Sequence, residues 1–308
     1  MSIVLIHQRA DLGEFKNLLQ EKLPKTKIEL LDEVSHPDAV EFAISWKHPH
    51  GTFKQFKNLK VIASFGAGVD HIFKDADLPK NIKITKIINE QLTKDMCDFV
   101  LMHCLNYIRN THFNFQKQDE KKWEAQPYKA PKEVQVGVLG LGTLGSAVAQ
   151  TLASRGFKVS GWSNSKKNIE NVKSYPKNEL DDFLKQSQIL VCLLPLTNQT
   201  KGILNSTIFE KLPEQSCLIN VARGEHLNED DLKKAIENNK IKAAFLDVFQ
   251  EEPLPKSHWF WNNKAVFITP HVASVTNPVE VVSQLAENYR RFKEGKALKN
   301  EVDLEKAY

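Results

Sequence analysis

Short apolar runs alternate with segments of helical periodicity along most of the chain. In its first third, residues 3–6 form a continuous apolar run, and the largely apolar segments 28–31, 42–46, 59–65 and 82–85 also predict strands. Between the first two runs, apolar residues recur at helical spacing up to Pro24, and Phe53 and Phe56 indicate a short helix further on. Strands that are apolar on both faces and alternate with helices are typical of a parallel sheet covered by helices.

The same alternation resumes in the second part of the chain. Apolar runs that predict strands lie at 134–139, 157–162, 188–194, 217–221, 243–248 and 266–269. Helical periodicity covers 91–107, 146–154, 180–184, 206–212, 229–238 and 278–294. The polar stretch 110–132 is predicted to be a linker or a projecting arm. Its aromatic residues, such as Trp123, are either local anchors or contacts to a partner subunit, and the sequence leaves both readings open.

The run at 134–139 leads directly into a glycine pattern, Gly140-Leu141-Gly142-Thr143-Leu144-Gly145, and then into a helix and another strand. This context is typical of a dinucleotide-binding turn. Gly140 allows the sharp turn, Gly142 lets a pyrophosphate approach the backbone, and Gly145 lets the helix pack close to the sheet. The helix start offers free N–H groups to the phosphates. The competing interpretation is an ordinary glycine-rich turn.

Length and pattern together predict two domains. A chain of 308 residues exceeds one typical domain. We therefore predict an α/β protein with two doubly wound parallel-sheet domains, one flavodoxin-like and one of the Rossmann type, separated by an interdomain cleft. The predicted substrate-binding domain covers residues 1–98 and is completed by 277–308, and the NAD(P)-binding domain covers 99–276.

Charge and cysteine content exclude several classes of protein. The net charge of +4 is the small difference between 42 basic and 38 acidic residues, and the lysines are scattered, so no nucleic-acid partner is expected. The four cysteines show no C-x-x-C spacing, which favours buried free thiols over disulfides or a metal site. No signal peptide or membrane-spanning run is evident. We expect a cytoplasmic protein with no membrane partner.

Three polar residues follow the ends of three predicted strands, namely Arg223, Glu252 and His271. Ligands of open parallel sheets bind at that edge. An arginine can hold a carboxylate at two points, and an imidazole can exchange a proton with a carbonyl or hydroxyl oxygen near neutrality. A neighbouring glutamate would favour the imidazolium and orient the ring. Taken singly, each residue also has a structural interpretation: a helix cap, a solvated loop acid or a buried histidine beside a proline.

Several motifs occur in order along the chain. They are 140–145, Val221-Ala222-Arg223-Gly224, Leu246-Asp247-Val248-Phe249 with Glu252-Pro253-Leu254-Pro255, and Thr269-Pro270-His271-Val272-Ala273. With these motifs the chain resembles the D-isomer-specific 2-hydroxyacid dehydrogenase family. The resemblance implies that Arg223 binds substrate, that His271 is the acid/base and that Glu252 is its partner.

The resemblance extends to cofactor and substrate contacts. It implies that Asp247 contacts the nicotinamide carboxamide and that the loop at 65–70 holds the substrate carboxylate with the N–H groups of Ala67, Gly68 and Val69. Further expected cofactor contacts are Thr143, Leu144, Leu194, Pro195, Thr200, Val221 and Ala222.

Within the family, the chain most resembles the group of glyoxylate/hydroxypyruvate reductases of type A, through stretches such as 45–49 and 161–167. This implies reduction of a small 2-oxo acid to the D-2-hydroxy acid by a homodimer. Trp46 would then line the substrate pocket, although a core aromatic at a strand end is an equally good interpretation.

The residues after the second strand of the glycine motif bear on the choice of cofactor. An NAD site usually has an acid there, but this chain reads Ser163-Asn164-Ser165-Lys166-Lys167, with no acid before Glu170. Hydroxyls and lysines suit a 2′-phosphate, unless the lysines are simply surface residues. Related reductases tend to carry arginine where Asn164 stands, which weakens the case for strict selectivity. We expect NADPH to be preferred and NADH to be used as well.

Two other functions fit the sequence less well. One is a reductase of larger 2-oxo acids such as phenylpyruvate. The other is a non-catalytic, dinucleotide-sensing binding protein that kept the fold, which an intact set of Arg223, Glu252 and His271 disfavours.

Overall fold

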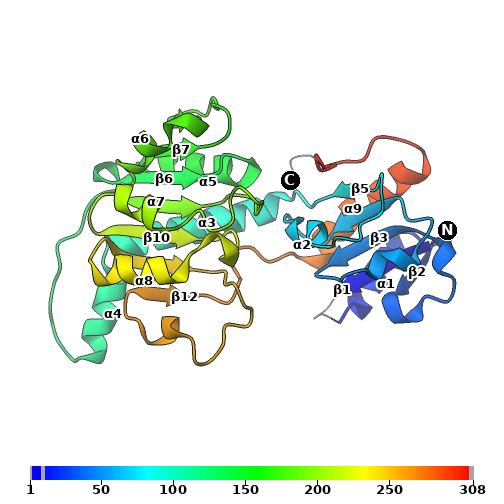
Figure 1. Ribbon diagram of the computed structural model, residues 1–308, viewed down its shortest axis with the longest axis horizontal. Helices are drawn as coiled ribbons and strands as arrows, with labels where there is room; N and C mark the ends of the chain where they lie inside the picture. Colours follow the sequence, from blue (N-terminus) through cyan, green and yellow to red (C-terminus); the bar gives the residue numbers. More distant parts are fainter. Residues whose placement is uncertain (1, 8–10, 305–308) are drawn as a thin grey trace. The chain divides into compact units, whose positions relative to one another are not determined.

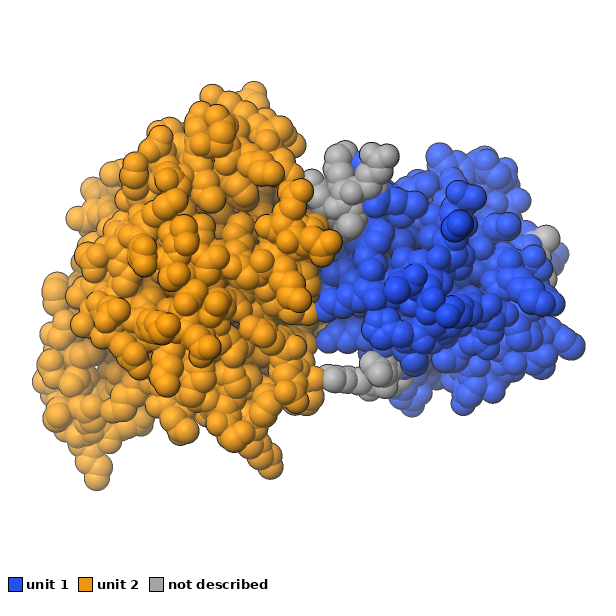
Figure 2. Space-filling view, viewed as in Figure 1, with its two compact units in different colours: residues 1–92, 276–308 blue, residues 93–275 orange. Residues whose placement is uncertain are grey.

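The chain folds into two compact units (Figure 2). The computed structural model describes residues 2–7 and 11–304. Unit 1 comprises Met1–Leu92 with Thr276–Tyr308, and unit 2 comprises Thr93–Val275. Unit 2 is therefore inserted into the sequence of unit 1, whose last helix comes from the far end of the chain.

Unit 1 is built on a five-stranded sheet of order β2-β1-β3-β4-β5, in which every neighbouring pair is parallel (Figure 1). Its strands are β1 (Ser2–His7), β2 (Lys27–Leu30), β3 (Val40–Trp46), β4 (Val61–Ser64) and β5 (Lys83–Thr85). Its helices are α1 (Gly13–Lys22), α2 (Asp70–Phe73) and α9 (Pro278–Lys293), with 3-10 turns at Leu31–Glu33, Pro37–Ala39 and Thr52–Gln55.

Alternate residues of each strand in unit 1 enter two different cores. Ile3 and Leu5 of β1 pack with residues of α1 and α9, whereas Val4 and Ile6 pack on the other face with Phe53 and Phe56. Side chains of a strand alternate between the two faces of the sheet, so both faces are buried and the strand is apolar throughout. This is why the apolar runs lack a two-residue alternation with polar residues.

Unit 2 is built on a seven-stranded parallel sheet of order β12-β11-β10-β9-β6-β7-β8. Its strands are β6 (Gln135–Leu139), β7 (Lys158–Trp162), β8 (Val172–Tyr175), β9 (Ile189–Cys192), β10 (Ser216–Asn220), β11 (Ile241–Leu246) and β12 (Val266–Ile268). Its helices are α3 (Glu90–Ile108), which starts before the unit boundary, α4 (Thr111–Asp119), α5 (Thr143–Ser154), α6 (Leu180–Leu184), α7 (Ser206–Lys211) and α8 (Glu229–Glu237). Four 3-10 turns complete it, at Pro131–Glu133, Lys177–Glu179, Gly224–His226 and Trp259–Asn262.

Helices cover both faces of this sheet as well. Val100 of α3 and Val148 of α5 share one core with Val136 and Val138 of β6. Residues of α6, α7 and α8 share the opposite core with Leu139 of β6. The strand order reverses between β6 and β9, and such a switch point is where open α/β sheets bind ligands.

These sheets confirm the predicted fold class of two doubly wound parallel sheets. Part of the stretch 110–132 was predicted wrongly, because α4 occupies its first half. His112 of α4 is buried against the rings of Phe245 and Phe267, a tertiary contact that the polar sequence does not reveal. Strand β8 was not predicted, and the short helix around Phe53 is a 3-10 turn.

The cysteines are Cys97, Cys104, Cys192 and Cys217, and all four are free and buried, which confirms the prediction of buried thiols. Among the helices of the described residues, none combines the length and the apolar character needed to cross a membrane.

Candidate active site

Three neighbouring strands of unit 2 carry the predicted reactive residues at the same edge of the sheet. Strands β10, β11 and β12 lie side by side and run parallel. Arg223 follows the end of β10, Glu252 follows β11, and His271 follows β12. Parallel strands present their carboxyl ends together, so the topology gathers residues that are far apart in sequence.

His271 and Glu252 form a hydrogen-bonded pair. The Nδ1 atom of His271 lies 3.0 Å from Oε1 and 3.0 Å from Oε2 of Glu252. A carboxylate only accepts hydrogen bonds, so Nδ1 carries a proton and donates it to this carboxylate. The side chains are 34% and 19% exposed respectively, so the imidazole is partly accessible. This arrangement leaves Nε2 as the ring atom that can exchange a proton with a bound molecule.

The buried carboxylate of Asp247 holds the turn that carries His271. Its Oδ1 accepts hydrogen bonds from the Thr269 hydroxyl at 2.6 Å and the Val272 amide at 2.9 Å, and its Oδ2 accepts one from the Ala273 amide at 2.9 Å. His271 itself has a φ of 58°, a left-handed conformation that is uncommon for a residue other than glycine. Asp247 therefore fixes a turn that the backbone of an isolated chain would rarely adopt. The nicotinamide contact that the resemblance implies for Asp247 stays a prediction.

The loop that carries Arg223 is fixed by two buried polar side chains. Asn220 accepts a hydrogen bond from the Ala222 amide at 3.2 Å and donates one to the Arg223 carbonyl at 3.0 Å. The two ring nitrogens of His226 lie 3.2 Å from the Arg223 carbonyl and 3.3 Å from the Pro195 carbonyl. Burial lowers the pKa of His226, and a neutral ring can donate to only one of the two carbonyls.

Gly224 brings the Arg223 loop against the loop that follows β11. A Cβ atom at position 224 would lie 1.9 Å from the carbonyl carbon of Phe249 and 2.3 Å from the backbone nitrogen of Gln250. Any larger residue would push these two loops apart. The glycine is thus required for Arg223 to lie close to the segment that leads to Glu252.

The glycine turn after β6 shows two kinds of steric requirement. A Cβ at Gly140, whose φ is 100°, would lie 2.8 Å from the Leu193 carbonyl oxygen, and one at Gly145 would lie 1.7 Å from the Gly140 oxygen. A Cβ at Gly142 would meet nothing within 4 Å. The protein itself does not require glycine at 142, and open space there suits the close approach of a phosphate. The residues present therefore fit a dinucleotide.

The predicted 2′-phosphate residues lie beside this turn. Strands β6 and β7 are paired, and the Gly140 amide donates to the Trp162 carbonyl at the end of β7. Ser163 follows β7 directly, and its hydroxyl donates to the Ser165 carbonyl at 2.8 Å. Asn164, Ser165, Lys166 and Lys167 are exposed. Exposed hydroxyl and ammonium groups thus follow the end of the strand next to β6.

The remaining predicted cofactor residues lie on other strand ends of the same sheet or at the start of α5. Leu194 and Pro195 follow β9, while Val221 and Ala222 follow β10. The Thr200 hydroxyl donates to the Pro195 carbonyl at 2.6 Å and accepts from the Thr197 amide at 2.8 Å, which closes the loop after β9. Thr143 and Leu144 open α5, where the first backbone N–H groups have no partner within the helix.

The predicted substrate loop belongs to unit 1 and follows β4. The Ser64 hydroxyl donates to the Gly68 carbonyl at 2.7 Å and accepts from the Gly66 amide at 3.1 Å, which pins the loop. In the part of the chain that the structure describes, no hydrogen bond uses the N–H groups of Ala67, Gly68 or Val69. Three adjacent amides without a protein acceptor suit a bound anion. Because α2 has only four residues, its dipole adds little.

Trp46 lies beside this loop at the end of β3. A Cβ atom at Gly66 would lie 2.8 Å from its ring, and the ring of His71 packs on it with a centroid distance of 4.5 Å. The side chain is partly exposed and also packs against the core of unit 1, so both interpretations of Trp46 stay open.

The sequence motifs contain the predicted reactive residues but not the side chains that hold their loops. Asn220, His226 and Ser64 all have buried or loop-closing side chains that no motif singled out. One signal was available for two of them, since Asn220 and Ser64 are polar residues that directly follow the apolar part of a strand, at its last position.

Residues 101–273 match the family model described as D-isomer specific 2-hydroxyacid dehydrogenase, NAD binding domain. The glyoxylate/hydroxypyruvate reductase A of Photorhabdus laumondii is 36% identical over 315 residues, and that of Escherichia fergusonii is 33% identical over 314 residues, each covering 100% of both chains.

Solved structures resemble the whole chain. A D-isomer specific 2-hydroxyacid dehydrogenase from Xanthobacter autotrophicus, in complex with NADPH and MES, aligns with a TM-score of 0.93 at 36% identity, covering 100% of this chain and 99% of that one. The NADPH-dependent glyoxylate/hydroxypyruvate reductase of Sinorhizobium meliloti, in complex with NADP and sulfate, aligns with a TM-score of 0.92 at 32% identity, covering 100% of both chains.

Proposed function

The chain belongs to the D-isomer specific 2-hydroxyacid dehydrogenase family, and from this premise we propose that it reduces a small 2-oxo acid, glyoxylate or hydroxypyruvate first, to the D-2-hydroxy acid with NADPH. The observation that carries the proposal is the pair of His271 and Glu252, 3.0 Å apart and partly exposed. It lies on the carboxyl edge of the sheet whose β6 end bears the glycine turn. The relatives named as glyoxylate/hydroxypyruvate reductases support the choice of substrate.

We assign the dinucleotide to residues 99–276, and we assign residues 1–98, completed by 277–308, as the substrate-binding domain. The open space at Gly142 and the first turn of α5 support the dinucleotide assignment. The unused amides of Ala67–Val69 and the adjacent Trp46 support the substrate assignment. The NADP or NADPH bound to two similar structures supports the proposal of an NADP-preferring enzyme that also accepts NAD.

Each residue of the site would have a separate role in the reduction. The reduced nicotinamide, when bound, supplies hydride chemistry. His271 donates the proton on Nε2 to the substrate carbonyl oxygen as that oxygen gains charge, while Glu252 accepts the hydrogen bond from Nδ1 and fixes the orientation of the ring. Arg223 offers a planar guanidinium to the substrate carboxylate. Asp247 keeps the His271 turn in place, so the proton is delivered from a fixed position.

Steady-state rates on a panel of 2-oxo acids test this proposal. Oxidation of NADPH and of NADH would be followed with glyoxylate, hydroxypyruvate and phenylpyruvate. We expect the highest kcat/KM with NADPH and one of the two small acids. A preference for phenylpyruvate would favour the reductase of larger acids instead. Tight binding of dinucleotide without turnover of any acid would favour the sensing protein.

The lysines after β7 provide a test of cofactor preference. Replacing Lys166 and Lys167 together by alanine should raise the KM for NADPH about tenfold, because a charge-assisted hydrogen bond to phosphate is lost. The KM for NADH should change less than about twofold. Lys158→Ala at the exposed start of β7 is the matched control. An equal effect on both cofactors would remove the 2′-phosphate assignment.

We also propose a homodimer located in the cytoplasm. Phe115, Trp123 and Tyr128 are 63%, 105% and 61% exposed, all within or just after α4, and aromatic residues are common at subunit interfaces. The four free thiols support a reducing compartment. Light scattering should give the mass of two chains for the wild type and of one chain for Trp123→Ser. A monomeric wild type would end the dimer proposal.

A further inference from the structure

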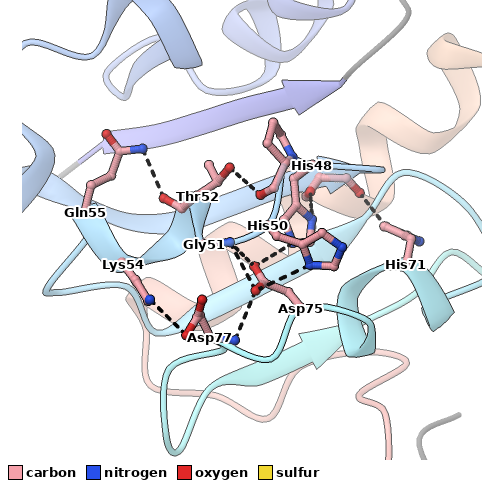
Figure 3. A network of polar contacts seen from close by, with 11 residues as sticks. His48, His50, Gly51, Thr52, Lys54, Gln55, His71, Asp75 and Asp77 are labelled. Carbon is pink, nitrogen blue, oxygen red and sulfur yellow. Dashed lines mark hydrogen bonds and ion pairs between the residues drawn. The ribbon is translucent and has the colours of Figure 1, made fainter.

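A buried network of polar side chains lies at the end of β3 in unit 1 (Figure 3). The Nδ1 atom of His48 lies 3.1 Å from the Ser45 hydroxyl, and its Nε2 atom lies 3.1 Å from Oδ2 of Asp75. The side chains of His48 and Asp75 are each 1% exposed. Neither can reach a bound substrate, so their contribution must pass through the residues that they hold.

Asp75 connects three segments of the chain. Its carboxylate accepts hydrogen bonds from the Gly51 amide at 3.1 and 3.0 Å, from the Asp77 amide at 3.0 Å and from His48. These partners come from the end of β3, the loop before the Thr52–Gln55 turn and the segment after α2. The network therefore ties the end of β3 to the segment that continues from the substrate loop through α2.

The direction of each hydrogen bond follows from the charges. Burial lowers the pKa of His48, although Asp75 partly offsets this effect. Burial alone would raise the pKa of Asp75, but hydrogen bonds from Asp77, Gly51 and His48 outweigh it and lower the pKa. A neutral His48 therefore donates from Nε2 to the carboxylate and accepts at Nδ1 from the Ser45 hydroxyl.

Trp46 lies between Ser45 and His48, the two residues at the end of β3 that are hydrogen-bonded in the network. Ser45 precedes it, and the Ser45 carbonyl accepts hydrogen bonds from the Phe65 amide at 3.2 Å and from His71 Nε2 at 3.3 Å. Lys47 follows it with a φ of 49°, a conformation that needs support from its surroundings. His71 and Gly66 lie against the Trp46 ring. The network and its neighbours thus place the ring beside the loop of Ala67–Val69.

We propose that His48 and Asp75 are positioning residues that hold Trp46 against the substrate loop, and that the fixed ring limits the length of the 2-oxo acid that the loop accepts. The proposal rests on the function proposed above. It assigns selectivity for small acids to a buried network that does not touch the substrate.

The ratio of kcat/KM for glyoxylate to kcat/KM for phenylpyruvate tests this role, because the fraction of folded enzyme cancels in the ratio. His48→Phe keeps a ring but loses both hydrogen bonds, and we expect the ratio to fall about tenfold. Asp75→Asn, which keeps an oxygen for the Gly51 and Asp77 amides, serves as a second variant if His48→Phe folds poorly. His48→Gln retains an N–H donor toward Asp75 and should restore most of the ratio. The exposed His36, changed to Phe, is the control and should leave the ratio unaltered.

A double-mutant cycle separates positioning through Trp46 from a general loss of structure. In a Trp46→Ala background, His48→Phe should change the ratio less than about twofold. An equal fall in both backgrounds, or an unaltered ratio in His48→Phe and Asp75→Asn, would overturn the proposal.

A second readout does not depend on turnover. Trp46→Phe identifies the indole N–H resonance of Trp46 among the five tryptophans. In His48→Phe this resonance should shift while those of the tryptophans in unit 2 stay in place. If the wild type reduces neither acid, the proposed function fails, and an unshifted Trp46 resonance would then separately overturn the positioning role.

Discussion

Unit 1 and unit 2 each contain a histidine paired with a carboxylate at the carboxyl edge of a parallel sheet. The pairs have nearly the same length, 3.1 Å for His48 and Asp75 and 3.0 Å for His271 and Glu252. Their exposure differs: both members of the first pair are 1% exposed, whereas His271 is 34% and Glu252 19% exposed. Hydrogen-bond geometry alone therefore does not mark a reactive histidine, and access to a bound molecule does.

The largest expected effect comes from the exposed pair. His271→Gln should lower kcat about 1000-fold, because general acid catalysis contributes roughly 10²–10⁴-fold, while the affinity for NADPH stays within about twofold. Steady-state kinetics and cofactor titration measure the two quantities. His258→Gln is the matched control, since His258 pairs with Glu229 at 2.9 Å elsewhere in unit 2. Undiminished turnover of His271→Gln would remove the assigned role.

The buried pair should matter for stability instead. Asp75→Ala leaves His48 and two backbone amides without an acceptor, which should lower the unfolding free energy of unit 1 by about 3 kcal/mol. Hydrogen exchange of the amides in β3 and β4 measures this change. Asp77→Ala, which removes only the exposed ion pair with Lys54, should cost less than about 1 kcal/mol. If Glu252→Ala destabilises unit 2 as much as Asp75→Ala destabilises unit 1, the buried pair is not the more important one for stability.

A third histidine, His103 of α3, is buried like His48 but has no hydrogen-bond partner on either ring nitrogen among the described residues. Burial lowers its pKa to about 4. Between about pH 6.5 and pH 4, His103 is protonated more readily in the unfolded chain than in the folded one. The contribution of neutral His103 to the unfolding free energy is therefore fully present above about pH 6.5 and is lost as the pH falls. The loss reaches about 3 kcal/mol near pH 4.

His103→Phe should remove this pH dependence. Hydrogen exchange of unit 2 at several pH values in that window would show a smaller loss of stability for the variant than for the wild type. His36→Phe, at an exposed position, should behave like the wild type. An identical loss in His103→Phe would mean that other groups cause the acid sensitivity.

The smallest effect sharpens the role of the partner in the exposed pair. Glu252→Gln can still accept the hydrogen bond from Nδ1 of His271, but a neutral amide oxygen accepts it less strongly than a carboxylate. We expect kcat to fall about tenfold, well short of the effect of His271→Gln. Glu251→Gln, at the exposed neighbouring residue, should change kcat less than twofold. A loss as large as that of His271→Gln would mean that Glu252 does more than orient the ring.

Much of this architecture could be predicted from sequence, because the strands are buried on both faces. The apolar runs in β1, β6 and β9 follow from that burial alone, and the glycine turn follows from local steric needs at Gly140 and Gly145. Helix α4 was missed because its one buried histidine owes its place to Phe245 and Phe267, residues far along the chain. Local composition carries no signal for such a contact.

The candidate site also has a part that could be predicted from sequence and a part that could not. Arg223, Glu252 and His271 could be predicted because reactive residues follow strand ends in a parallel sheet. The hydrogen bonds that Asp247 and Asp75 accept could not be predicted, since their donors are backbone amides and side chains of other segments. An aspartate that braces a turn looks the same in sequence as one on the surface.

The insertion of unit 2 into unit 1 has a consequence for biosynthesis. Val281, Leu285 and Ala286 of α9 belong to the core that also contains β1 and α1. A ribosome that adds roughly 5–20 residues per second must translate all of Thr93–Val275 before it makes that helix. The part of this core that α9 covers therefore emerges roughly ten to forty seconds before that helix. During that interval the nascent chain presents apolar surface that a chaperone would recognise.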